Sequence, residues 1–201
     1  LNDFLRVLND TWQSYVKDYK SSKFDYQKDF YKTNINPIIL KEQKVFVIIS
    51  DALRYECAVE LKNKILGLNR YSAEIKPMVG VLPSFTQLGI ASLLPNDTLS
   101  FDSSDDSVYV NNISSRGTKN RDKILKKTND KSVYIDSESF LDLNKNDGRE
   151  FSKANQVIYI YHNEIDAIGD KKESEHKVFN AVEDSFITIQ KIIKQISNMN
   201  G

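Results

Sequence analysis

The sequence lacks most of the features that would tie it to an oxidising compartment, a membrane or a charged partner. It has one cysteine, Cys57, so no disulfide can form within the chain. The 28 basic and 28 acidic residues give a formal net charge of zero, so no global field draws the protein towards nucleic acid, membrane or a basic partner. Any charged ligand must therefore be recognised locally.

Two further absences concern the location of the protein, and its length limits the number of domains. No apolar run is long enough to span a bilayer, and the chain shows no secretory signal. We therefore expect a soluble, cytoplasmic protein that does not act in a membrane. A chain of 201 residues suits one domain, or one domain with a helical extension, and can bury roughly two-thirds of its unfolded surface.

The first 40 residues are predicted to form a helical extension ahead of a domain that spans residues 41–201. Residues 20–40 are polar and aromatic by turns and contain a turn signal at Pro37, so we expect a connection or a second short helix there. Residues 1–19 are predicted to form an amphipathic helix, because apolar side chains recur at helical spacing with charged residues between them. These apolar positions are Leu1, Leu5, Leu8, Trp12, Tyr15 and Tyr19.

From residue 45 onwards, strand and helix patterns alternate. Residues 45–49 are continuously apolar, which predicts a strand buried on both faces at the centre of a parallel sheet. Residues 52–66 have the pattern of a helix that ends near Gly67. Further strands are expected within 71–82 and at 132–135 and 157–161, and further helices at 88–94, 121–127 and 178–196.

Residues 96–118 interrupt this alternation. They are rich in Asn, Asp, Ser and Gly and offer only residues 108–110 as a strand candidate, so we expect a mobile surface excursion. The alternation elsewhere predicts an α/β fold, in which a mostly parallel sheet is flanked by helices on both faces. In such folds ligands bind beyond the carboxyl ends of the strands.

Two residues lie where this rule places a ligand site. Asp51 follows the first predicted strand, and its carboxylate is expected either to bind a metal or to cap the next helix. Thr86 is expected in the first turn of a helix, where free backbone N–H groups would stabilise a phosphate and a nearby alkoxide. The alternative is that Ser84 or Thr86 only caps that helix.

Residues 161–170 hold a denser group of ionisable side chains, directly after a predicted strand. His162, Glu164, Asp166 and Asp170 are all found there. Three carboxylates so close together repel one another without a cation, and this set of oxygen and nitrogen ligands suits zinc or manganese. The alternative is a solvated acidic loop. His176 lies in an ordinary charged stretch and is assigned no role.

Because each of these sites follows a strand or begins a helix, all of them can converge on one edge of the sheet. A hydroxyl nucleophile beside metal-binding carboxylates can transfer a phosphoryl group through a covalent intermediate. Arg54 follows Asp51 closely, and its guanidinium is expected either to hold a phosphate oxygen or to pair with Glu56 or Glu60.

Three motifs together resemble the PglZ family of the alkaline phosphatase superfamily, in their order and approximate spacing. They are residues 47–56 (VIISDALRYE), 82–89 (LPSFTQLG) and 161–170 (YHNEIDAIGD). The resemblance covers about residues 42–197. PglZ proteins are best known from bacterial phage-defence systems of the BREX type.

The resemblance implies roles for the candidate residues. Asp51 matches the aspartate that binds one metal of a two-metal centre, and Thr86 matches the nucleophile, which also contacts that metal. Asp166 and Asp170 have the spacing of an aspartate and a histidine that bind the second metal. Because aspartate stands at 170, the ligands among His162, Asp166 and Asp170 stay open. The implied cofactor is two zinc ions, with manganese or magnesium as alternatives.

The remaining ligands of the superfamily have no counterpart after Ile196, so we expect the chain to be the truncated N-terminal and central part of the domain. The implied function is a metal-dependent phosphoesterase, either a phosphodiesterase or a phosphatase, within a phage-defence protein. Its partners would be a phosphoester substrate, such as a nucleotide or nucleic acid, and other phage-defence proteins. The alternative is a catalytically inactive scaffold in a multi-protein defence complex.

Overall fold

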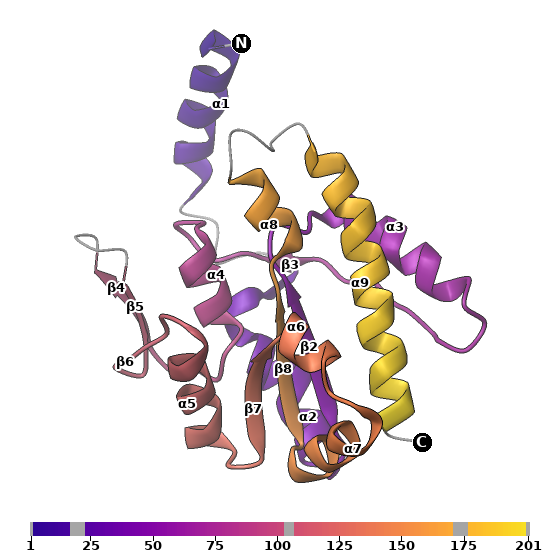
Figure 1. Ribbon diagram of the computed structural model, residues 1–201. Helices are drawn as coiled ribbons and strands as arrows, with labels where there is room; N and C mark the ends of the chain where they lie inside the picture. Colours follow the sequence, from indigo (N-terminus) through magenta and orange to yellow (C-terminus); the bar gives the residue numbers. More distant parts are fainter. Residues whose placement is uncertain (1, 17–22, 103–106, 171–176, 200–201) are drawn as a thin grey trace.

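The computed structural model describes residues 2–16, 23–102, 107–170 and 177–199. Its centre is a parallel sheet of three strands in the order β2 (Val45–Ser50), β8 (Val157–His162) and β7 (Ser132–Asp136) (Figure 1). All three strands were predicted from their apolar runs. The central position, however, belongs to β8, and β2 lies at one edge of the described sheet, so the prediction of β2 as a central strand is wrong.

One face of the sheet packs against α4 (Thr86–Ser92) and α5 (Thr118–Thr128). Side chains alternate between the faces of a strand, and Val157 and Tyr159 belong to this side. Their partners in the core include Ile90 from α4, Leu125 from α5 and Val47 from β2, all buried. This cluster is the largest of the described core.

The other face is covered by α9 (Val178–Met199), α6 (Ser137–Leu141), α7 (Lys145–Ala154) and α3 (Tyr55–Leu66) (Figure 1). Ile158 and Ile160 of β8 point this way and pack with Phe140 and Ile192. Phe186 of α9 packs in a neighbouring cluster with Leu61 of α3. Helices on both faces of a mostly parallel sheet confirm the predicted α/β class and agree with an alkaline phosphatase-like fold.

The segment predicted to be a surface excursion is largely a small antiparallel sheet. It contains β4 (Leu99–Asp102), β5 (Ser107–Val110) and β6 (Ile113–Ser114), in that order. Asn111 and Asn112 both have positive φ, at 48° and 64°, as the two central residues of the β5–β6 hairpin require. The strand candidate at residues 108–110 is confirmed as part of β5, but Val108 and Val110 are buried in the main core, so this segment is not the surface excursion that was expected.

Within the predicted N-terminal helix, the described residues form α1 (Asn2–Tyr15), which projects from the rest of the chain and buries none of its residues (Figure 1). Leu1 and Tyr19 of the predicted apolar stripe lie outside the described residues. Residues 25–39 instead reach the core, where Tyr31 and Ile35 are buried. The division of the chain at residue 40 stays a prediction. This stretch consists of β1 (Asp25–Tyr26), a 3-10 turn η2 (Gln27–Asp29), a π-helical turn η3 (Tyr31–Ile35) and α2 (Asn36–Ile39). Strand β1 pairs in parallel with β3 (Met78–Val79).

No helix in the described ranges is both long enough and apolar enough to cross a bilayer. A cytoplasmic location stays a prediction.

Candidate functional site

The carboxyl ends of β2 and β8 bring two of the candidate residues together. The parallel register places Ser50 opposite His162, and the backbone N–H of Asp51 donates to the carbonyl of His162 at 2.9 Å. Asp51 and His162 are 111 residues apart in sequence, and the strand pairing alone makes them neighbours. The predicted convergence at this edge is therefore present for these two residues.

The carboxylate of Asp51 does not cap a helix. Helix α3 begins at Tyr55, its N-cap is Arg54, and no side chain caps it. Oδ1 of Asp51 instead accepts from the backbone N–H of Ala52 at 3.0 Å, and Oδ2 accepts from the hydroxyl of Tyr161 at 2.9 Å. Since each carboxylate oxygen can accept more than one hydrogen bond, both keep acceptor capacity for a cation or a ligand.

The backbone at this junction is strained. Ala52 has φ of 60°, in the left-handed region that costs a residue with a Cβ about 1–2 kcal/mol. Such strain persists only where the surrounding structure fixes it, and it is concentrated at functional sites. The left-handed turn directs the chain away from the end of β2 and leaves Asp51 at the edge of the sheet.

The proton of Tyr161 is held firmly in its hydrogen bond to Asp51. Burial raises the pKa of the Tyr161 hydroxyl well above its usual value, and the hydrogen bond to Asp51 and the charge of that carboxylate raise it further. The hydroxyl therefore remains a donor through the neutral pH range. It fixes the orientation of the Asp51 carboxylate.

Thr86 is the first residue of α4, and its side chain is exposed. The N-cap of this helix is Phe85, and no side chain makes a capping hydrogen bond. The alternative that Ser84 or Thr86 serves only as a cap is therefore not seen. The prediction of Thr86 in the first turn of a helix is confirmed, while its role as a nucleophile stays a prediction.

His162 lies at the same edge but is enclosed. Its side chain is 2% exposed. Nδ1 lies 2.9 Å from the hydroxyl of Ser50, and Nε2 lies 3.1 Å from a carboxylate oxygen of Glu164. An ionised carboxylate can only accept, so Nε2–H donates to Glu164, and in the neutral ring Nδ1 accepts from Ser50. To bind a metal, His162 would have to give up one of these two hydrogen bonds.

Asp166 and Asp170 lie four residues apart on and just beyond α8 (Glu164–Gly169). The segment is mainly a short helix and not the solvated loop of the alternative interpretation. The spacing of four residues puts both carboxylates on one side of it. Burial raises the pKa of Asp166, and the charges of Asp51 and then Asp170 raise it further. Asp166 is therefore close enough to both Asp51 and Asp170 to be repelled by their charges.

The chemistry of these donors fits part of a divalent-metal site. Carboxylate oxygens suit zinc, manganese and magnesium, and a cation would relieve the repulsion felt by Asp166. Nevertheless, no three His, Cys, Asp or Glu side chains in the described ranges are grouped closely enough to hold a metal ion. The metal ligands stay predictions.

Arg54 is exposed at the N-cap of α3. Among the described residues it makes no ion pair with a carboxylate, and Glu60 pairs with Lys64 at 3.3 Å instead. The alternative that Arg54 forms a surface ion pair is therefore not seen. Its guanidinium is available to solvent near the strand end that carries Asp51.

A residue that the sequence analysis missed connects these parts. Arg121 of α5 is 5% exposed, and its guanidinium donates three hydrogen bonds to neutral acceptors: the carbonyl of Ser115, the hydroxyl of Tyr134 and Oε1 of Gln87, each at 3.0 Å. Its guanidinium also lies over the ring of Tyr161, 5.4 Å from the centroid. It thereby links the residue after Thr86 to the tyrosine that holds Asp51.

One pattern in the sequence indicates that Arg121 lies on a buried helix face. It falls on the apolar stripe of α5, three and four residues before the buried Ile124 and Leu125. A cation at such a position is either directed out of the core or buried among hydrogen-bond acceptors. The structure shows the second outcome.

A pocket of about 630 Å³ opens beside these residues, at the carboxyl ends of β7 and β8. Its lining includes Tyr161, His162, Asn163 and Asp136. The side-chain oxygen of Asn163 is buried, and it has no hydrogen-bond partner in the described part of the chain. A small ligand in this pocket would thus lie at the strand ends, beside a residue whose amide oxygen is unsatisfied.

Comparison with known proteins agrees with the fold and the motifs. A family model described as the BREX system PglZ alkaline phosphatase-like domain matches residues 30–201. The alkaline phosphatase-like protein PglZ of Bacillus cereus (strain H3081.97) is 39% identical over 199 residues, which cover 98% of this chain and 23% of the relative. The alkaline phosphatase-like protein BrxZ of Escherichia coli O9:H4 (strain HS) is 42% identical over 175 residues, which cover 86% of this chain and 20% of the relative.

The chain therefore spans less than a quarter of the length of these relatives. The family match nevertheless covers most of the chain and includes all three motifs. The chain belongs to the PglZ family of alkaline phosphatase-like domains from BREX systems.

Proposed function

We propose that the whole protein is a metal-dependent phosphoesterase of a phage-defence system, with Thr86 as its nucleophile. The observation that carries this proposal is the contact chain between the two motifs. Thr86 lies at the uncapped start of α4, the next residue Gln87 accepts from Arg121, and Arg121 lies over Tyr161, which donates to Asp51. Thr86 and Asp51 are thus connected by one chain of partly buried contacts, which supports their proposed roles as nucleophile and metal ligand.

The metals would be held by Asp51 and Thr86 on one side and by Asp166 and Asp170 on the other, with the remaining ligands elsewhere in the whole protein. When bound, they supply Lewis-acid stabilisation of the charge on the phosphoryl oxygens. Zinc is the first candidate, with manganese and magnesium as alternatives. His162 is the less favoured ligand, because both of its ring nitrogens already have partners.

The reaction would proceed in two displacements. Thr86 Oγ1 loses its proton as it forms a bond to phosphorus, the ester bond breaks, and the leaving alcohol takes up a proton. The resulting threonyl phosphate is then attacked by water, which restores Thr86 and releases phosphate or a phosphomonoester. Free backbone N–H groups in the first turn of α4 and the guanidinium of Arg54 would stabilise the phosphoryl oxygens. Tyr161 keeps the Asp51 carboxylate in one orientation throughout.

The substrate class is a phosphoester, such as a nucleotide or a nucleic acid. Other proteins of the same defence system would be its partners. The family description supports both proposals, since it names an alkaline phosphatase-like domain of the BREX system.

The test is turnover by the whole protein and three of its variants. Thr86→Ala should abolish hydrolysis of bis-p-nitrophenyl phosphate or p-nitrophenyl phosphate, whereas Thr86→Ser keeps a hydroxyl and should retain part of it. Ser84→Ala is the matched control, because it removes an exposed hydroxyl two residues away and should leave the rate unchanged. Metal content by mass spectrometry, measured on the same samples, should be close to stoichiometric.

One observation favours a second candidate, an inactive scaffold. The described residues do not assemble three metal-binding side chains. A whole protein that carries no metal, shows no turnover, and still supports phage resistance when Thr86 is replaced by Ala would establish the scaffold and reject the enzyme.

A further inference from the structure

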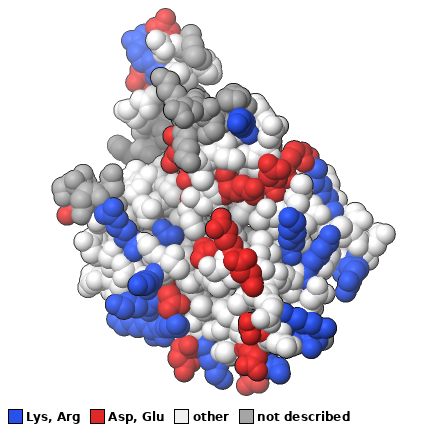
Figure 2. Space-filling model, viewed as in Figure 1, with Lys and Arg blue, Asp and Glu red and all other residues white. Residues whose placement is uncertain are grey.

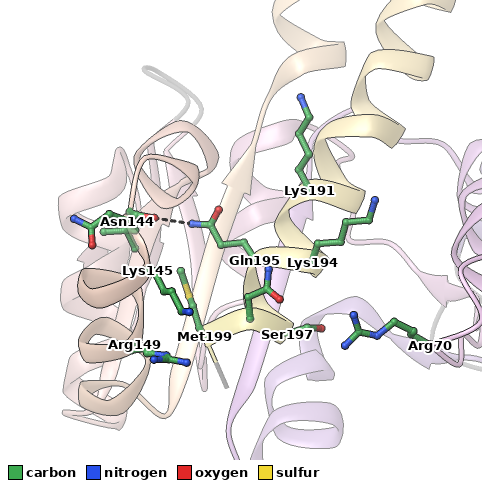
Figure 3. A pocket seen from close by; sticks show the side chains of 11 residues that line it. Arg70, Asn144, Lys145, Arg149, Lys191, Lys194, Gln195, Ser197 and Met199 are labelled. Carbon is green, nitrogen blue, oxygen red and sulfur yellow. Dashed lines mark hydrogen bonds between the residues drawn. The ribbon is translucent and has the colours of Figure 1, made fainter. Parts of the chain in front are cut away.

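A second pocket lies away from the candidate site, against the last turns of α9 (Figure 3). Its volume is about 750 Å³, in the range of about 300–1,000 Å³ that small-molecule sites occupy. It contains none of the candidate catalytic or metal-binding residues. Its cationic lining comes from three segments: Lys145 and Arg149 of α7, Lys191 and Lys194 of α9, and Arg70 from the chain after α3.

The lining is segregated by charge. Although basic and acidic residues are equal in number in the sequence, no Asp or Glu belongs to the described lining of this pocket. Figure 2 shows cationic side chains beside the lower course of α9, with acidic ones higher up, towards the centre and along the lower edge of the molecule. A concave surface lined by one sign of charge concentrates counter-ions within it.

Helix stability does not explain these positions. Lys145 is in the first turn of α7, where the helix dipole disfavours a cation. Lys191 and Lys194 lie before the last turn of α9, which contains no basic residue, so the dipole at that end does not favour them either. Each helix also places two cations three or four residues apart, an arrangement that destabilises a helix by about 0.2–0.5 kcal/mol.

The shape of the pocket is fixed by specific contacts. Gln195 of α9 donates to the carbonyl of Phe140 at 2.7 Å and to that of Leu143 at 3.4 Å, which ties α9 to the turn before α7. Gly148 permits close approach of the two helices, because a Cβ there would lie 2.5 Å from the terminal carbon of Met199. The cationic side chains therefore project from a rigid base.

We propose that this pocket binds a small ligand with several phosphate groups, of the nucleoside polyphosphate class. Arginine binds phosphate in a bidentate manner and lysine as a point charge, and the lining offers both. The volume suits a single nucleotide, and the zero net charge of the chain argues against a long nucleic-acid footprint. The proposal does not depend on the phosphoesterase function.

The test measures binding of inorganic tripolyphosphate and of ATP to the whole protein, by calorimetric titration. A Thr86→Ala background prevents turnover at the candidate catalytic site. The pocket variant is Lys191→Gln with Lys194→Gln. The matched control is Lys119→Gln with Lys123→Gln, which neutralises two exposed lysines of α5 outside the pocket.

We expect both ligands to bind saturably, and the pocket variant to weaken both by about tenfold or more, because charge-assisted contacts are lost. The control variant should stay within about twofold of the parent, since charges farther than a Debye length are screened. Circular dichroism should show equal helix content in both variants.

Three results would overturn the proposal. Absence of saturable binding rejects the site. If the pocket variant and the control variant weaken ligand binding equally, the binding is a general effect of charge and not the property of this pocket. Binding of a DNA oligonucleotide without terminal phosphates, with no binding of tripolyphosphate or ATP, would assign the pocket to nucleic acid instead.

Discussion

Replacing Arg121 with methionine tests whether a buried cation holds the candidate site together. Methionine keeps much of the apolar volume but removes every hydrogen bond of the guanidinium. The carbonyl of Ser115, the hydroxyl of Tyr134 and the amide oxygen of Gln87 each lose a donor. The hydroxyl and the amide can turn towards other partners, whereas the carbonyl cannot.

The expected cost follows from these three contacts. A hydrogen bond to a charged group contributes about 1.5–3 kcal/mol, and an orphaned buried acceptor costs about 1–3 kcal/mol. Part of this loss of stability is offset, because the variant has no buried charge whose desolvation opposes folding. We expect the free energy of unfolding to fall by about 3 kcal/mol, a large effect for one substitution.

Urea unfolding of the chain, followed by circular dichroism, measures this difference. Lys123→Met is the control, because it removes an exposed cation from the same helix and should change stability by less than about 0.5 kcal/mol. A double-mutant cycle with Tyr134→Phe should give a coupling of about 1 kcal/mol. If Arg121→Met costs no more than the control, the guanidinium is not a structural link between α4 and Tyr161.

Three further predictions concern single side chains. Phe140→Ala should cost about 3–5 kcal/mol of unfolding free energy in urea titrations, because Phe140 is fully buried, whereas Phe179→Ala on the exposed side of α9 should cost little. Asp136→Ala should cost about 1 kcal/mol at neutral pH, because Asp136 caps α6 by accepting from Ser139. Burial acts to raise the pKa of Asp136, but the hydrogen bonds from Ser139 lower it overall, so this contribution should be complete above the ordinary carboxyl pKa and be lost as the pH falls through the lowered value. Asp166→Asn should stabilise the metal-free chain by a few tenths of a kcal/mol at neutral pH, because the raised pKa of Asp166 makes its ionisation less favourable in the folded than in the unfolded chain. The gain should vanish at low pH, where the carboxyl is protonated in both states, and stabilisation by added zinc should be lost in the variant.

The sequence predicted the parallel sheet well because buried strands have a distinct pattern. Residues 45–49, 132–135 and 157–161 are short apolar runs, and each is a strand of the sheet. Strand order could not be predicted in the same way. The central strand is β8, which pairs with β7 on one side and, on the other, with β2, more than a hundred residues earlier in the chain; a local pattern contains neither pairing.

Polar composition misled the analysis of residues 96–118. Its strands are short, and β5 has only four residues, of which Val108 and Val110 face the core. Two valines among serines and aspartates give a weak strand pattern, although the Asn111–Asn112 pair is a hairpin signal. Helices α6 and α7 were missed as well, since α6 has only five residues and α7 is strongly polar.

The residues of the candidate site also differ in how far local sequence patterns predict them. Asp51 and Thr86 could be predicted because each lies at the boundary between an apolar run and a polar residue, and the structure keeps both at such boundaries. Arg121 could not be predicted from its own surroundings, because its role depends on Gln87 and Tyr161, which lie on other elements. A residue that binds a ligand is often visible in its motif, whereas a residue that positions the motif is defined by tertiary contacts. Substitution of Arg121 should therefore disturb Thr86 and Asp51 together, while substitution of either motif residue should leave the other in place.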